Sequence, residues 1–129
     1  MIVVDTSALV AIILGEPTAD RCLATLESSA LVAISAGTLA EALLVAGRRN
    51  KLDEMQQLID GVSPEIVDVT ASMARLVADA YRRWGKGFHP AALNFGDCFA
   101  YALAAERGCP LLYVGGDFAR TDIVAARPA

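Results

Sequence analysis

The chain begins with Ile2-Val3-Val4-Asp5-Thr6-Ser7-Ala8-Leu9, an apolar run interrupted by a single carboxylate. Ile2 to Asp5 has the β-branched composition of a buried strand, and Ser7 to Leu14 predicts a helix directly after it. Asp5 is the only charged residue from Met1 to Gly15. The stretch therefore predicts a buried strand that ends in a carboxylate and is followed by a helix, the first unit of an α/β fold.

The rest of the chain repeats this alternation of short β-branched runs and helical segments. Predicted helices cover 17–28, 38–50, 52–59, 71–84 and 97–107, and predicted strands cover 31–34, 66–69, 111–114 and 123–126, with a loop over 85–94. This order predicts a three-layer α/β fold in which a central parallel sheet of four to five strands is flanked by helices. With 129 residues and no compositional break, we expect one domain over 1–129.

Three further carboxylates share the isolation of Asp5. Glu41 is the only charge from 31 to 47, Asp97 from 90 to 105, and Asp117 from 108 to 119. Burial of a carboxylate without a partner is costly, and these stretches contain no Lys or Arg to serve as one. The pattern indicates that a bound divalent metal supplies the missing positive charge, as in hydrolases that act on phosphodiesters.

The predicted elements place the four acids at one edge of the sheet. Asp5 ends the first strand, Asp117 follows the strand at 111–114, and Glu41 and Asp97 lie near the starts of their helices. Ligands of open parallel sheets bind at the carboxyl ends of the strands, so the four side chains are expected to converge there.

Each acid also has a purely structural explanation. Asp5 is suited to cap the helix after it, and Asp117 to cap a short turn at Phe118. Thr38 with Glu41, and Asn94 with Asp97, have the spacing of a capping box. A non-catalytic module whose acids merely cap helices is therefore an open alternative. The functional interpretation depends on the four acids occurring together.

Composition narrows the class of protein further. The net charge of −4 argues against a protein that coats nucleic acid through a broad basic face, but it does not exclude a nuclease. Apolar runs fall short of the ~20 residues that span a bilayer, and no basic segment precedes the N-terminal apolar stretch. The three cysteines, Cys22, Cys98 and Cys109, lie in apolar surroundings without CxxC spacing, which predicts free thiols. We expect a cytoplasmic protein that does not insert into membranes.

Four segments together resemble the PIN domain, most closely the VapC-type toxins of bacterial toxin–antitoxin pairs. They are Ile2 to Leu9, the helix around Glu41, Leu93-Asn94-Phe95-Gly96-Asp97-Cys98-Phe99-Ala100-Tyr101-Ala102-Leu103-Ala104, and Leu111-Leu112-Tyr113-Val114-Gly115-Gly116-Asp117-Phe118 with Thr121-Asp122. The resemblance covers nearly the whole chain. It implies a PIN-like three-layer fold and a Mg²⁺-dependent endoribonuclease, with Mn²⁺ as a substitute, acting as the toxin of a type II pair.

The resemblance also implies roles for particular residues. Asp5, Glu41 and Asp97 match the core metal-binding acids, and Asp117 matches a fourth acid that is more loosely involved. The supporting positions are Thr6 and Ser7, whose hydroxyls follow the first acid, and Asn94, which orients the site or caps its helix. Expected partners are an RNA substrate, a cognate antitoxin docked in an apolar groove, and a second copy of the chain.

Two basic clusters are candidates for contact with the RNA backbone. They are Arg48 and Arg49 with Lys51, and Arg82 and Arg83 with Lys86 beside Trp84, which is available for stacking. Cations that favour the C-terminal end of a helix are the structural alternative for both. Arg120 and Asp122 are candidates for a supporting role at the site, whereas His89 is expected at the surface and not as a general base.

Two other enzymatic functions remain open. A housekeeping PIN nuclease of RNA processing would share the acidic pattern. A phosphoryl-transfer enzyme with Asp5 as nucleophile ranks lower, because it would need a second acid two residues later, where the chain has Ser7.

Overall fold

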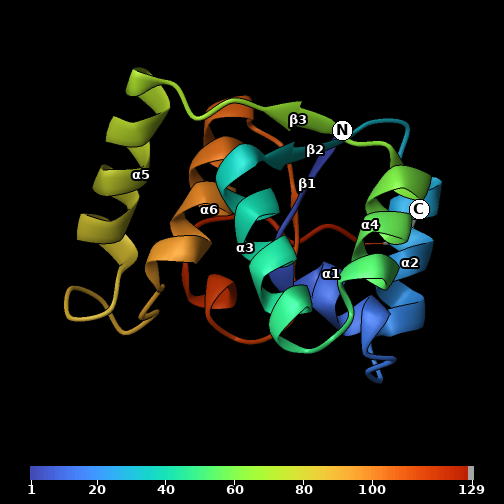
Figure 1. Ribbon diagram of the computed structural model, residues 1–129. Helices are drawn as coiled ribbons and strands as arrows, with labels where there is room; N and C mark the ends of the chain where they lie inside the picture. Colours follow the sequence, from blue (N-terminus) through green and yellow to red (C-terminus); the bar gives the residue numbers. More distant parts are fainter. Residues whose placement is uncertain (128–129) are drawn as a thin grey trace.

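A computed structural model describes residues 1–127 and shows a sheet between two layers of helices (Figure 1). The strands are β1 (Ile2–Val4), β2 (Val32–Ser35), β3 (Glu65–Val67) and β4 (Leu111–Leu112). The helices are α1 (Thr6–Ile13), α2 (Ala19–Ser28), α3 (Ala36–Arg48), α4 (Leu52–Val62), α5 (Ala71–Trp84) and α6 (Phe95–Arg107), and a 3₁₀ helix, η1, spans Phe118–Arg120. The predicted three-layer α/β fold is confirmed.

All the strand pairs in the sheet are parallel, and the strand order is β3-β2-β1-β4. β1 lies in the interior, with Val3 opposite Ala33 on one side and opposite Leu111 on the other. A parallel sheet requires a crossover after each strand, and helices supply these crossovers here. The arrangement brings the end of β1 next to the end of β4, although the two strands are far apart in sequence.

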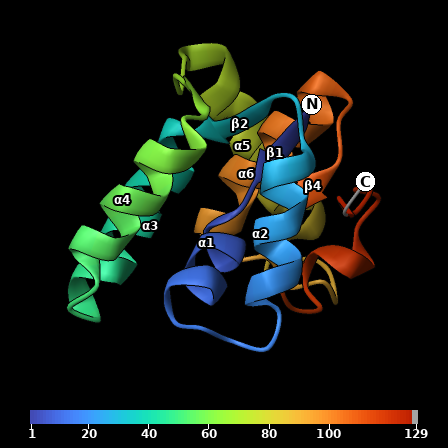
Figure 2. The same cartoon turned by 90° about the vertical axis from the view of Figure 1, so that its right-hand side faces the viewer.

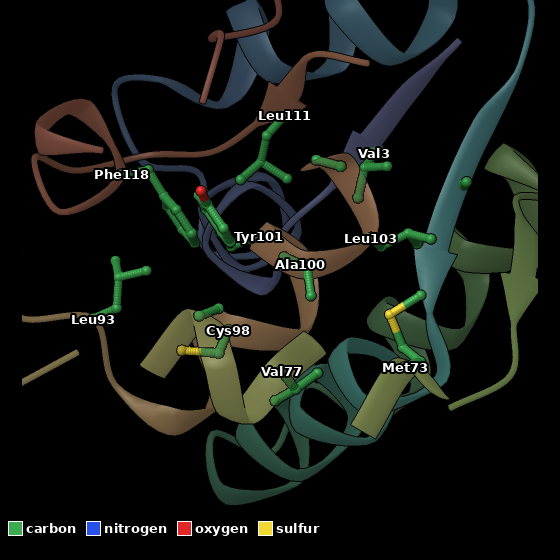
Figure 3. Close-up of a cluster of buried hydrophobic side chains, with 14 residues drawn as sticks. Val3, Met73, Val77, Leu93, Cys98, Ala100, Tyr101, Leu103, Leu111 and Phe118 are labelled. Carbon is green, nitrogen blue, oxygen red and sulfur yellow. The ribbon is translucent and has the colours of Figure 1, made fainter. Parts of the chain in front are cut away.

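Alternate residues of the strands face two separate cores. Val3, Ala33 and Leu111 pack against α5 and α6 in the cluster drawn in Figure 3. Val4 and Ile34 pack on the opposite face against α1 to α4. Both faces of the sheet are therefore covered at β1, β2 and β4, which explains why these strands are mainly apolar without alternation, whereas the edge strand β3 is largely exposed. Figure 2 shows the molecule turned so that α2 and α4 face the viewer.

The predicted strand over Ile123–Ala126 is wrong. Leu111 donates to Val124 O at 2.9 Å and accepts from Ala126 N at 2.9 Å, so this segment forms only an isolated bridge with β4. β4 is also shorter than the predicted 111–114. The backbone N–H of Val114 donates to Ser7 Oγ at 3.0 Å, which turns the chain away from the strand direction.

Two other sequence predictions concern the cysteines and membranes. Cys22 and Cys98 are buried, Cys109 is half-buried, and all three are free thiols, as predicted. Within residues 1–127, the structure contains no helix with the length and apolar character needed to cross a bilayer.

Candidate active site

Asp5 occupies the turn between β1 and α1 and is only 2% exposed. Its Oδ2 accepts a hydrogen bond from the backbone N–H of Ser7 at 3.0 Å, so Asp5 caps α1 as predicted. Its other oxygen, Oδ1, is buried and has no hydrogen-bond partner within the described chain. Burial raises the pKa of Asp5 from 3.8 to about 7, and the charges of Asp97 and Glu41 add to the rise. Capping thus explains one oxygen of this carboxylate and leaves the other unexplained.

Asp97 lies in the first turn of α6. Its Oδ2 accepts from the backbone N–H of Asn94 at 3.0 Å, and Asn94 Oδ1 accepts from the backbone N–H of Asp97 at 2.8 Å. This is the predicted capping box. Burial raises the pKa of Asp97 to about 6, the hydrogen bond from Asn94 opposes the rise, and the charges of Glu41 and Asp117 add to it. The capping box therefore fixes a carboxylate that faces other acids.

Glu41 does not belong to a capping box, contrary to the sequence prediction. α3 begins at Ala36, two residues earlier than expected, because Ser35 Oγ accepts from the backbone N–H of Gly37 at 3.2 Å and caps the helix. Thr38 is consequently inside the helix and fully buried. Glu41 stands in the second turn, and helix capping gives no account of its carboxylate.

Gly96, which sequence reasoning missed, allows Glu41 to reach α6. A Cβ atom on Gly96 would lie 2.0 Å from Glu41 Oε2, so the carboxylate rests directly on the backbone of α6. Gly37 of α3 makes a similar close approach, because a Cβ there would lie 2.4 Å from the ring of Phe99. The two glycines let α3 and α6 approach closely, and this brings Glu41 beside the helix that carries Asp97.

Asp117 is exposed and precedes η1, and its side chain makes no capping hydrogen bond. The predicted capping role is therefore wrong. Its position is fixed by its neighbours: Phe118 is buried in the core, and the hydrogen bond from Val114 N to Ser7 Oγ ties the preceding turn to the start of α1. The charge of Asp117 contributes to the raised pKa of Asp97, so these two carboxylates interact electrostatically.

The predicted acids Asp5 and Asp97 thus interact electrostatically with each other and with Glu41, and Asp97 also interacts with Asp117. Within residues 1–127, none of them forms an ion pair with a Lys, Arg or His side chain. No three acidic, Cys or His side chains of the described chain are arranged so that they could hold a metal ion as they stand. The four acids offer carboxylate oxygens, the ligand type that Mg²⁺ and Mn²⁺ prefer, but they do not form a ready-made metal site.

The hydroxyls after Asp5 have structural partners. Thr6 Oγ1 donates to the carbonyl oxygen of Thr38 at 3.3 Å, which ties the start of α1 to α3. Ser7 Oγ accepts from Val114 N, as described above. These two residues therefore hold the segments that carry the acids in place.

The predicted basic candidates lie at helix ends. Arg48 and Arg49 are exposed at the C-terminal end of α3. Arg82 forms an ion pair with Asp79. Arg83 Nη2 lies 3.6 Å from Asp122 Oδ2, and Arg83 Cζ lies 4.7 Å from the ring centroid of Trp84. The ends of α3 and α5 both lie at the lower end of the molecule in Figure 1. Contact of these arginines with RNA remains a prediction.

Trp84, Asp122 and His89 form a structural network around Tyr101. Trp84 Nε1 donates to the hydroxyl of Tyr101 at 2.9 Å, and that hydroxyl donates to Asp122. His89 is half-buried rather than fully exposed, and its ring centroid lies 4.7 Å from that of Trp84. Arg120 donates to the carbonyl oxygen of Pro90 at 3.1 Å. These residues hold the C-terminal segment to α5, α6 and the loop over 85–94.

Comparison with known proteins identifies the family. The PIN domain model matches residues 2–124. The chain is 44% identical over 134 residues to Ribonuclease VapC42 of Mycobacterium tuberculosis, which covers 98% of each protein. The fold is similar to that of M. tuberculosis VapC20, a sarcin-ricin loop cleaving toxin, with a TM-score of 0.80, 21% identity, and coverage of 99% of this chain and 100% of that one. It is also similar to a toxin–antitoxin complex from Klebsiella pneumoniae, with a TM-score of 0.73, 18% identity, and coverage of 98% and 97%. The chain therefore belongs to the PIN-domain family, among its VapC-type members.

Proposed function

We propose that the protein is a metal-dependent endoribonuclease, a hydrolase of RNA phosphodiester bonds, and the toxin of a type II toxin–antitoxin pair. The observation that carries the proposal is the buried Oδ1 of Asp5, which has no hydrogen-bond partner within residues 1–127, on a carboxylate whose pKa is raised by burial and by the charges of Asp97 and Glu41. A buried, uncompensated acid is a poor stabilising element and a suitable ligand for a divalent ion. The name of a relative 44% identical to this chain supports the same function.

Asp5, Glu41 and Asp97 would hold Mg²⁺ or Mn²⁺, with Asp117 as the outer, fourth acid. Mg²⁺ does not require a complete protein cage, because it keeps several waters and binds through one or two carboxylates together with substrate phosphates. When bound, the metal supplies neutralisation of the phosphate and a water of lowered pKa for attack on phosphorus. Once ionised, the carboxylates of the chain would orient that water by accepting hydrogen bonds from it, and one of them would take up the proton that the water loses on attack.

The structure weakens the alternatives. A non-catalytic module would use all four acids as caps, whereas Glu41 and Asp117 cap nothing. A phosphoryl-transfer enzyme would need Asp5 as an accessible nucleophile, whereas Asp5 is 2% exposed and its pKa is raised to about 7. The acids alone do not separate a toxin from a housekeeping PIN nuclease.

The metal and the cleavage are tested together. Purified protein should cleave single-stranded RNA with Mg²⁺ or Mn²⁺ and not with EDTA, and Mn²⁺ should raise its melting temperature. Asp97→Asn should lose both effects while remaining folded. Asp122→Asn is the matched control, because Asp122 belongs to the Tyr101 network and not to the acidic cluster. Full cleavage by Asp97→Asn would refute the assignment.

The antitoxin is tested in cells. A groove between α2 and α4 is lined by the apolar side chains Leu23, Leu26, Leu58 and Val62 together with the polar side chains Glu27, Ser29 and Gln57. A mixed lining of this kind suits an amphipathic helix of the antitoxin. Expression of the chain alone should arrest growth, and co-expression of a small protein encoded beside it should restore growth. Light scattering should then show a dimer of the chain and a larger complex with the antitoxin. Normal growth on expression of active nuclease would favour the housekeeping alternative.

A further inference from the structure

The ring of Phe95, the first residue of α6, is 65% exposed. The ring lies edge-to-face with that of Phe99, at a centroid distance of 5.0 Å and an interplanar angle of 74°. Phe99 is in turn held against Gly37 of α3. Phe95 therefore contacts the ring of Phe99 on one side, and most of its own ring is exposed to solvent.

The core does not explain this ring. Phe99 packs against the core cluster on the α5 and α6 side of the sheet, whereas Phe95 belongs to neither core cluster of the described residues. An exposed phenylalanine gains little from the hydrophobic effect. Packing in the hydrophobic core therefore does not account for a phenylalanine at position 95.

Helix geometry places Phe95 beside the acids. Successive side chains of an α-helix leave the axis about 100° apart. The direction that a side chain of Gly96 would take is filled by the carboxylate of Glu41. Phe95 and Asp97 consequently flank Glu41, one on each side.

The facing helix continues this apolar surface. Gly37, Glu41 and Leu44 lie on one face of α3, because they are spaced four and three residues apart. Gly37 meets Phe99 and Glu41 meets Gly96, so Leu44 extends beyond the start of α6, and it is 55% exposed. An apolar rim formed by Phe95 and Leu44 thus borders the acidic cluster.

We propose that Phe95 is a substrate-binding residue that stacks on an unpaired base of single-stranded RNA next to the bond to be cut. The proposal rests on the proposed function. The chain has a net charge of −4 and concentrates four acids at the site, so contacts with phosphates alone give little affinity. A base is neutral and presents a flat face that stacks on aromatic rings regardless of sequence.

The test measures RNA binding apart from cleavage. A fluorescein-labelled single-stranded RNA is titrated with Asp97→Asn protein, and with the same protein carrying Phe95→Ala, Phe95→Trp or Phe88→Ala. Phe88 is the matched control, because it is 62% exposed and also rests edge-to-face on another ring, that of Tyr81, but it lies in the loop after α5. Melting curves and light scattering establish that each variant is folded and in the same oligomeric state.

Phe95→Ala should weaken binding roughly 5- to 150-fold, the range found when stacking aromatics are replaced by alanine. Phe95→Trp should retain binding, and Phe88→Ala should leave it unchanged. An abasic ribose-phosphate oligomer of equal length should bind Phe95→Ala and its parent equally. With Asp97 intact, the same replacement of Phe95 should raise KM more than it lowers kcat.

Three results would overturn the proposal. Phe95→Ala could bind RNA as tightly as Phe88→Ala, it could lose equal affinity for the abasic oligomer, or it could dissociate a dimer and so identify the ring as an interface between two copies. Wild-type cleavage separates this failure from failure of the proposed function. If the wild type cleaves RNA and Phe95→Ala binds normally, only the stacking role falls. If the wild type neither binds nor cleaves RNA, both fall.

Discussion

Replacement of Asp5 by Asn should stabilise the metal-free protein, although Asp5 lies at the centre of the proposed site. Asn retains an oxygen that accepts from Ser7 N and caps α1 as well as Asp does. The substitution also removes the free-energy cost of holding an ionised carboxylate in the buried position. The pKa of Asp5 rises from 3.8 to about 7 on folding, and about 3 pKa units correspond to about 4 kcal/mol, an upper value because the coupling to Asp97 is shared.

The pH dependence fixes the sign of this effect. Between pH 4 and pH 7 the folded state holds the proton of Asp5 and the unfolded state does not, so the wild type loses stability as pH rises through that window. Below about pH 4 the carboxyl is protonated in both states, and wild type and Asp5→Asn should differ little. Above pH 7 the variant should be more stable by a few kcal/mol. Urea unfolding in EDTA, repeated across this pH range, measures the difference.

Two comparisons make the experiment decisive. Asp68→Asn changes an exposed aspartate in the loop after β3 and is the control for removal of a carboxylate that is not buried. Saturating Mn²⁺ should stabilise the wild type and not Asp5→Asn, which reverses their order. A stability difference between wild type and Asp5→Asn that stays constant from pH 4 to pH 8 would refute the reasoning.

Three further changes test the packing around the site. Gly96→Ala should change the free energy of unfolding in urea by less than about 1 kcal/mol, because the Glu41 carboxylate is the flexible end of its side chain and can move away. The displaced carboxylate should lower Mn²⁺ affinity in titrations and the rate of RNA cleavage, each by roughly tenfold or more. Tyr101→Phe should cost about 0.5–1.5 kcal/mol in urea unfolding, because it removes the hydrogen bonds of a hydroxyl whose partners, half-buried Trp84 and exposed Asp122, can turn to water. Leu103→Ala, at a side chain 1% exposed, should cost about 2–5 kcal/mol by the same measurement, and a cost below 1 kcal/mol would contradict the packing shown in Figure 3.

Local sequence patterns were sufficient for most of the fold. The strand at Ile2–Val4 and the helix at Ala71–Trp84 have the composition and periodicity of their element types, and the structure contains both. The burial of Asp5 followed from its isolation in an apolar run. In these cases the decisive interactions lie within a few residues of each other, which is why the sequence reveals them.

Errors arose where a distant residue decides the outcome. The composition around Val114 predicts a strand, but the backbone N–H of Val114 donates to Ser7 Oγ and not to a neighbouring strand. The spacing of Thr38 and Glu41 predicts a capping box, whereas Ser35 at the end of β2 accepts the hydrogen bond from Gly37 N and caps α3. No local pattern reveals the contact between Gly96 and Glu41, because it exists only once two helices have packed together.

The position of β1 between β2 and β4 has a consequence for the order of events during synthesis. Chains emerge from the ribosome with the N-terminal part first, so Asp5 is synthesised long before α6, which carries Asp97, and β4. A ribosome translating this message therefore meets no complete acidic cluster until residues as far as Asp117 have been made. For a protein proposed to cleave RNA, the topology itself delays activity until α6 and β4 have followed β1.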